Sequence, residues 1–135
     1  MVDTNIIIRD WLIAQTGITD LVSNRVYAAN PLPENVTLPA ISFFTRGGTS
    51  IAEVPTIVMP SVQFNCWADD PIESRKIYRA LYDELNGLNN AQITIDGTDY
   101  FILYSREEVQ GQDIQDDIPD FWNTMAFFTI TIRNY

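Results

Sequence analysis

Apolar and polar residues alternate most regularly between residues 61 and 68. Val62, Phe64 and Cys66 fall on one face, and the residues between them are polar. This period of two is typical of a half-buried strand, and Pro60 suits its beginning. We therefore expect a strand over this segment with its apolar face toward the core.

A helix is predicted directly after this strand. Asp70 can accept hydrogen bonds from the free N–H groups of the first turn, Pro71 suits the first helical position and Glu73 completes a capping box. The helix should run from Pro71 to about Asn86, with Arg79 and Asp83 paired across one turn. Four apolar residues at helical spacing should form its core-facing stripe: Ile77, Leu81, Leu85 and Leu88.

The amino-terminal segment predicts a second helix. Asp3 or its neighbour can cap a helix that runs to about Thr16, and Gly17 is well placed as its carboxyl-terminal stop. Residues 19–24 can add a short helical turn, and residues 25–27 have an extended pattern. A proline-containing, irregular loop should follow.

The remaining strands are predicted by alternation and by one turn. Residues 41–46 alternate, and at the end of the chain residues 128–132 alternate with isoleucine and phenylalanine inward. Residues 93–95 and 100–104 flank Asp96–Gly97, a pair that favours a tight two-residue hairpin. These elements predict a single α+β domain over residues 1–135: an antiparallel sheet of about four main strands with two helices packed on one face.

Two segments interrupt this pattern. Residues 47–60 contain two glycines and two prolines, and they predict a hairpin arm that projects from the body. Residues 106–121 carry two glutamates and four aspartates, and they predict an acidic loop.

Charge limits the kinds of partner. The chain has 135 residues, a mass of 15.4 kDa and a formal net charge of −10. Binding to nucleic-acid phosphates or anionic membranes depends on lysine and arginine, so both are disfavoured. The first residues lack a basic region, and no apolar run approaches the length of a bilayer span; we expect neither a secretory leader nor a membrane segment.

Catalytic chemistry is mostly missing from the sequence. There is no histidine, which removes the commonest general base and the usual activator of serine and cysteine nucleophiles. Lys76 is the only lysine and no glycine-rich phosphate loop precedes it. Cys66, the single cysteine, should be a buried, inert thiol. We expect a protein that is not an enzyme and has no cofactor.

The acidic segment has two interpretations. Its carboxylates could bind Mg²⁺ or Ca²⁺, but they lack the ordered spacing of a calcium loop, so we expect no metal site. The segment is then either a solvated surface loop or a contact that lines a channel, where negative charge would repel DNA phosphates. Trp122 is similarly either a core residue or an interface anchor, and Trp67 needs a helix or a partner to cover it.

The order of short motifs resembles that of the tail-completion or tail-terminator proteins of long-tailed bacteriophages. The resemblance begins with an apolar first helix that contains Ile8–Arg9, and it covers nearly the whole chain. The other motifs, which are structural rather than catalytic, are Arg25–Tyr27, Leu38–Phe43, Val62–Ala68 with the helix after it, and Thr129–Tyr135. Residues 47–59 and 107–120 depart from the family pattern, so no family detail is transferred to them.

The resemblance implies a structural virion protein. Such proteins assemble in the host bacterial cytoplasm as hexameric rings on the head-proximal end of the tail tube, end its growth, and join it to the head–tail connector while DNA passes without specific binding. Arg25, Arg46 or Arg133 could bridge acidic edges between neighbouring subunits. The expected contact residues are Arg46, Ile51, Glu53, Val54, Trp67, Phe121 and Trp122. The expected lumen or acidic surface consists of Glu107, Glu108, Asp113, Asp116, Asp117 and Asp120.

An acidic DNA mimic or adaptor is the alternative, because −10 is a high charge for a domain of this size. A mimic needs carboxylates spaced like phosphates along one exposed face. Here the acids concentrate in one segment and in helix caps, where local backbone contacts account for several of them. The ring protein is therefore the preferred hypothesis.

Overall fold

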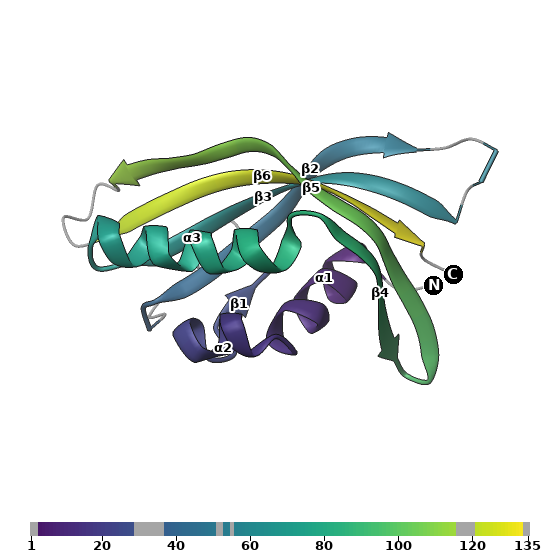
Figure 1. Cartoon of the computed structure of the whole chain (residues 1–135), viewed down its shortest axis with the longest axis horizontal. Coiled ribbons are helices and arrows are strands. Elements are labelled where there is room, and N and C mark those ends of the chain that lie inside the picture. Colours follow the sequence, from purple (N-terminus) through teal and green to yellow (C-terminus); the bar gives the residue numbers. More distant parts are fainter. Residues whose placement is uncertain (1–2, 29–36, 51–52, 55, 116–120, 134–135) are drawn as a thin grey trace.

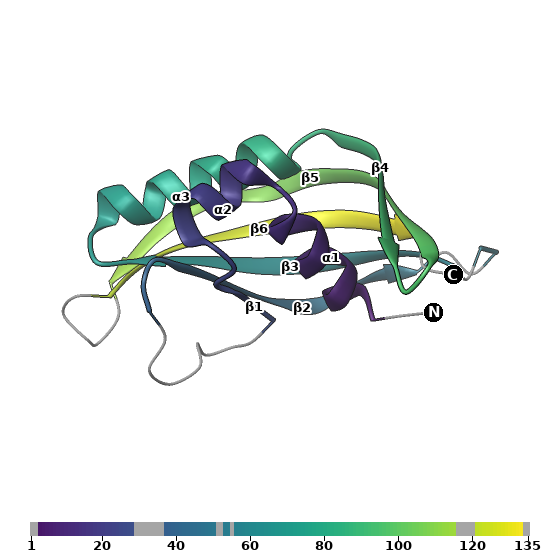
Figure 2. The same ribbon diagram turned by 90° about the horizontal axis from the view of Figure 1, so that it is seen from below.

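The chain folds as three helices on one side of a strongly curled six-stranded sheet (Figures 1 and 2). The computed structural model describes residues 3–28, 37–50, 53–54, 56–115 and 121–133. In chain order the elements are α1 (Thr4–Ile13), α2 (Thr16–Val22), β1 (Val26–Tyr27), β2 (Ala40–Ser50), β3 (Ile57–Ala68), α3 (Pro71–Leu85), β4 (Leu88–Ile95), β5 (Thr98–Gln115) and β6 (Trp122–Arg133).

The sheet differs from the one that the sequence predicts. Its strand order is β1-β2-β3-β6-β5-β4, and β1 pairs with β2 in parallel, so the sheet is mixed and has six strands. The expectation of an antiparallel sheet of about four strands with two helices is therefore wrong. One reason is β1: the extended pattern of residues 25–27 does not show that Val26 and Tyr27 join the sheet or that they pair in parallel with β2.

The junction between β3 and α3 is confirmed. The backbone N–H of Glu73 donates to the Asp70 carboxylate at 2.9 Å, and Pro71 begins the helix. Ile77, Leu81 and Leu85 are buried as predicted, and Arg79 lies 3.7 Å from Asp83. The fourth residue of the expected stripe, Leu88, instead begins β4 and is half-buried.

Replacing Asp70 by alanine should lower the free energy of unfolding by about 0.5–2 kcal/mol, because the first turn of α3 loses its side-chain acceptor. Asp69→Ala, one residue before the cap, is the matched control and should cost less. Urea denaturation of both variants measures the difference. Equal losses would mean that charge near the helix, and not the cap, is responsible.

The two helical segments predicted near the amino terminus are both found, but the boundary between them is wrong. Ala14 ends α1, and Gln15 is extended, with φ −95° and ψ 120°, before α2 begins at Thr16. Gly17 therefore lies inside α2 and is not the stop of α1. The break lets α1 and α2 present separate apolar residues to the sheet, among them Ile8, Leu12, Ile18 and Val22, all of which are buried.

The predicted acidic loop is wrong over residues 106–115, because β5 continues to Gln115 and pairs with β6 along this length. Three register irregularities along the β5–β6 ladder accommodate the long strand. The aspartates at 116, 117 and 120 lie outside the described residues.

The core lies between the helices and the concave face of the sheet. Phe64 packs against Phe43 and Phe128, with ring centroids 5.6 Å apart in each pair, and all three rings are fully buried. Cys66 is also fully buried, which confirms the expected burial of this thiol, and burial raises its pKa. The alternation of β6 is confirmed too, since Phe128, Ile130 and Ile132 are buried.

The hairpins β2–β3 and β4–β5 both reach past the helices at the same end of the molecule (Figures 1 and 2). The turn between β4 and β5 is the predicted Asp96–Gly97 pair, with φ +50° and +80°. Positive φ at both positions is the geometry that makes two-residue hairpins tight. In the other hairpin, β2 reaches Ser50 and β3 begins at Ile57, so paired strands extend into the segment predicted as an arm.

Candidate functional site

The face of the sheet opposite the helices, here called the outer face, carries aromatic and charged side chains. Alternation along each strand places these residues there, because their neighbours point to the core. The figures show all three helices on the other side of the sheet. The outer face comprises Ser42, Phe44, Arg46, Ser61, Gln63, Asn65, Trp67, Phe101, Arg106, Glu108, Asn123, Met125, Phe127, Thr129 and Arg133.

Arg46 is the centre of one cluster on the outer face. Its guanidinium lies over the Phe127 ring at 3.9 Å, and it forms an ion pair with Glu108 at 3.1 Å. Its Nε donates to the Ser61 hydroxyl at 3.1 Å. The Thr129 hydroxyl donates to the other oxygen of Glu108. Arg46, predicted to contact a neighbouring subunit, is thus held by residues of its own chain from three other strands.

The pKa of Glu108 lies below its ordinary value. The main cause is the hydrogen bond from Thr129; burial opposes it, and Ser61 and the charge of Arg46 add to it. A lowered folded-state pKa means that the ionised form stabilises the fold. This stabilisation is complete above the unfolded carboxyl pKa and is lost as the pH falls through the folded value.

Glu108→Gln should therefore destabilise the protein by about 1 kcal/mol at pH 7. The difference from wild type should shrink below about pH 4, where the wild-type carboxyl becomes protonated. Denaturation midpoints at a series of pH values measure this. Thr129→Val, which removes only the hydroxyl donor, should show part of the same effect. A difference that stays constant with pH would exclude the ionised carboxylate as its source.

A polar patch is buried beneath the aromatic rings of the outer face. Trp67 Nε1 donates to the Ser42 hydroxyl at 2.9 Å, and Asn123 Nδ2 donates to Asn65 Oδ1 at 3.2 Å. Phe121 meets the Trp67 ring edge to face at 6.4 Å. Trp67 is therefore half-buried by its own chain, and no described helix covers it. Trp122, opposite Ala68, is half-buried on the helix side of β6.

The predicted acidic residues do not form one wall. Glu108 is on the outer face, but Glu107 and Asp113 point to the helix side. Glu107 accepts a hydrogen bond from the Tyr78 hydroxyl at 2.5 Å, and Asp113 lies 3.5 Å from Arg75. Because residues 106–115 form a strand, successive side chains alternate between faces. The described acids are thus distributed over both faces and paired with neighbours.

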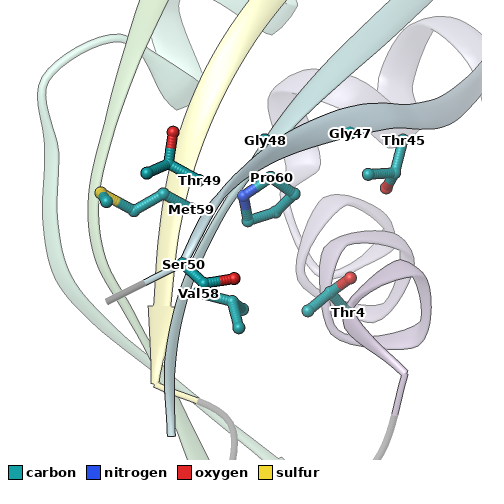
Figure 3. A pocket seen from close by; sticks show the side chains of 9 residues that line it. All are labelled: Thr4, Thr45, Gly47, Gly48, Thr49, Ser50, Val58, Met59 and Pro60. Carbon is teal, nitrogen blue, oxygen red and sulfur yellow. The ribbon is translucent and has the colours of Figure 1, made fainter. Parts of the chain in front are cut away.

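The end of the β2–β3 hairpin is the second candidate surface. Glu53 and Val54 are exposed there, whereas Ile51 lies outside the described residues. A pocket of about 260 Å³ separates this hairpin from the start of α1 (Figure 3). It is lined by Gly47–Ser50 and Thr45 of β2, Val58–Pro60 of β3, and Thr4. None of these side chains is charged, and the volume is below the roughly 300–1,000 Å³ typical of small-molecule sites.

Two features are not found in the part of the chain that the structure describes. No three histidine, cysteine or acidic residues there come together as metal ligands would. None of its helices combines the length and apolar character needed to span a membrane.

Three residues of the outer face that hold other side chains in place were not predicted from the sequence. Phe127, Ser61 and Thr129 were not selected, although they hold Arg46 and Glu108 in place. Their positions in alternating strands could have indicated the face. The registers of β3, β5 and β6 that bring them together could not be read from the sequence.

Comparison with known proteins finds a similar structure but no similar sequence. No protein-family model matches the chain, and no curated protein matches its sequence. A chain in the virion of a native gene transfer agent particle has a similar structure, with a TM-score of 0.60. The likeness covers 93% of this chain and 90% of that one, at 14% identity. At this identity the likeness shows a shared fold.

Proposed function

We propose that this protein is a structural protein of a bacteriophage-like virion. The observation that carries the proposal is the shared fold over nearly the full length of both chains, since the similar chain belongs to the virion of a gene transfer agent particle. The order of motifs along the sequence, which resembles that of phage tail-terminator proteins, supports the same proposal independently. Fold alone does not decide function, so an assembly experiment is needed.

In the finer form of the proposal, the protein forms a ring, most simply a hexamer, at the head-proximal end of a tail tube. The ring ends growth of the tube and joins it to the head–tail connector. Neighbouring subunits would repeat one contact between two different surfaces, as closed cyclic assemblies do. The partners are then further copies of this chain, the tube protein and the connector protein.

The charge of the ring would let DNA pass without binding. A net charge of −10 per copy repels phosphates at short range, and the effect adds over the copies. All three arginines suggested as bridges between neighbours have contacts within the chain. Arg25 donates to the Pro39 carbonyl at 2.8 Å, Arg46 pairs with Glu108, and the Arg133 guanidinium lies over the Phe101 ring at 4.4 Å. We propose a role in assembly, with no catalysis and no cofactor.

Absolute mass by light scattering across a concentration series tests this function. We expect a species of six times the 15.4 kDa chain, or reversible growth toward it, and sixfold rings in negative-stain images. Added Mg²⁺ should change nothing. A chain that stays monomeric both alone and with tail tubes would contradict the proposal. Salt-sensitive binding of such a monomer to basic proteins would favour the DNA mimic.

A further inference from the structure

The sheet ends at β4, an edge that lacks the usual protection against pairing. Its eight residues include no charged residue and no proline, the devices that most often keep edge strands apart. Ala91, Ile93 and Ile95 face the helix side, are half-buried and pack against the core. Gln92 and Thr94 on the other face are exposed. Within the described residues β4 pairs only with β5.

A second open edge lies along residues 43–50 of β2, here called distal β2. Its outer neighbour β1 pairs with Ile41 and Ser42 only. Residues 43–50 therefore have a strand partner on one side alone, among the described residues. A bulge at residues 46 and 47 divides this stretch, and Gly48–Ser50 form the regular part beyond it.

These two edges lie at the same level of the sheet. Ser50 is opposite Val58, Val58 is opposite Ile132, Ile132 is opposite Ile102, and Ile102 is opposite Ala91. Four antiparallel steps separate β2 from β4, so the two strands have the same sense within the sheet, although its twist turns β4 across the direction of β2 (Figures 1 and 2). With the helix sides of both copies on the same face, β4 of one copy would join β2 of the next in parallel, and a shift of two residues along the strands would bring Ile93 beside Ser50 and Gln92 beside Thr49.

The pocket beside distal β2 offers room on the matching face. It opens between Thr4 of α1 and the helix-side residues Ser50 and Val58, while Thr49 and Met59 point away from α1 (Figure 3). A strand added to β2 would place its own helix-side residues at this pocket. In β4 these are isoleucines, which are only half-buried in a single copy.

We propose that β4 of one copy adds in parallel to Gly48–Ser50 of the next copy, with Ile93 and Ile95 packing at the pocket between α1 and the β2–β3 hairpin. Strand addition of this kind gains main-chain hydrogen bonds for affinity and side-chain pockets for specificity. The two surfaces differ, so the contact is heterologous and repeats until a ring closes or a filament grows. The inference deepens the proposed function, because it supplies the contact on which a ring would rest.

The free N–H groups of β4 can be identified from its turn. In a two-residue hairpin the residues that close the turn, here Ile95 and Thr98, form a hydrogen-bonded pair. Hydrogen-bonded and open pairs alternate along an antiparallel ladder, so the N–H groups of Gln92 and Thr94 point to the open edge. Proline is tolerated in a strand where the N–H group faces solvent, so Gln92 is a site where it would leave the ladder to β5 intact.

The first test compares Gln92→Pro with Gln92→Thr. Both should keep the wild-type circular dichroism spectrum and denaturation midpoint. By light scattering, Gln92→Thr should assemble like the wild type. Gln92→Pro should need at least about tenfold higher protein concentration to assemble, because it loses one main-chain hydrogen bond between copies and disturbs the strand packing beside it. Equal assembly of folded Gln92→Pro and wild type would overturn the inference.

The second test mixes chains carrying Thr49→Cys with chains carrying Gln92→Cys and adds a short bismaleimide. Both positions are exposed, and the native Cys66 is fully buried. Cross-linking should occur in the mixture and not in either variant alone, because a heterologous contact joins position 49 only to position 92.

The outcomes of the second test separate the contact from the ring. Sixfold rings without the 49–92 cross-link would overturn the inference and leave the proposed function standing. Cross-linked open filaments would support the inference and contradict the ring. No cross-link and no assembly would contradict both.

Discussion

Replacing Phe64 by alanine should lower the free energy of unfolding by about 3–5 kcal/mol. The ring is fully buried at the middle of the sheet and contacts Phe43 on β2 and Phe128 on β6. Its removal loses apolar burial and leaves a cavity that three strands cannot close, since each is held in register by its neighbours. Such a loss is a large part of the 5–15 kcal/mol typical of a domain.

Phe44→Ala is the matched control for this variant. Phe44 is the next residue on β2, but it lies on the outer face and is half-buried. Phe44→Ala should lower the free energy of unfolding clearly less than Phe64→Ala, because neighbouring side chains of the outer face can move into the space that the ring leaves. Chemical denaturation followed by tryptophan fluorescence measures both. Similar losses for the two variants would mean that the outer face is packed as tightly as the core, and would argue for a second covering layer.

Gly48→Ala should destabilise the β2–β3 hairpin by about 2–4 kcal/mol. An added Cβ would lie 2.3 Å from the Met59 carbonyl oxygen and 2.7 Å from the Pro60 Cα, both of which are backbone atoms. Gly48 also has a φ of +146°, which side-chain-bearing residues rarely adopt. The strand cannot accept the methyl group without separating from β3.

Gly47→Ala provides the control for the clash. Gly47 has a φ of +95°, but nothing lies within 4 Å of an added Cβ, so only the backbone preference is lost. We expect a cost of about 1–2 kcal/mol. The difference between the two variants therefore measures the contact with β3. Hydrogen exchange should show faster opening of residues 48–50 and 58–59 in Gly48→Ala alone. Equal exchange in both variants would show that the hairpin moves to accept the methyl group.

The local elements were predictable where neighbouring residues decide them. Asp70, Pro71 and Glu73 define a helix start within four residues, and Asp96–Gly97 defines a turn within two. The burial of Cys66 and of alternate residues in β6 followed from period-two patterns. In each of these cases the stabilising free energy comes from contacts between residues close in the sequence. For the cap and the turn these are hydrogen bonds within one turn, and for the strands it is the burial of every second residue.

The errors occurred where a distant partner decided the structure. Residues 106–115 are polar and acidic, and such composition favours a loop. They form a strand because β6 pairs with them and because Tyr78, Arg75 and Arg46 accommodate the carboxylates of Glu107, Asp113 and Glu108. The two-residue β1 exists only because β2 lies beside it. The boundary between α1 and α2 was predicted at Gly17 and lies at Gln15 instead, because Gln15, an ordinary residue for a helix, is extended there.

The sequence by itself determined an acidic chain with a half-buried strand leading into a capped helix, a tight hairpin and a buried thiol. Tertiary structure alone decided the six-strand order, the separation of the acidic residues onto two faces, the cluster around Arg46, and the two open edges at one level. The physical reason is the range of the interactions. Caps, turns and alternation depend on residues a few positions apart. Strand order and register depend on pairings between residues far apart in the sequence, such as Ile57 with Arg133.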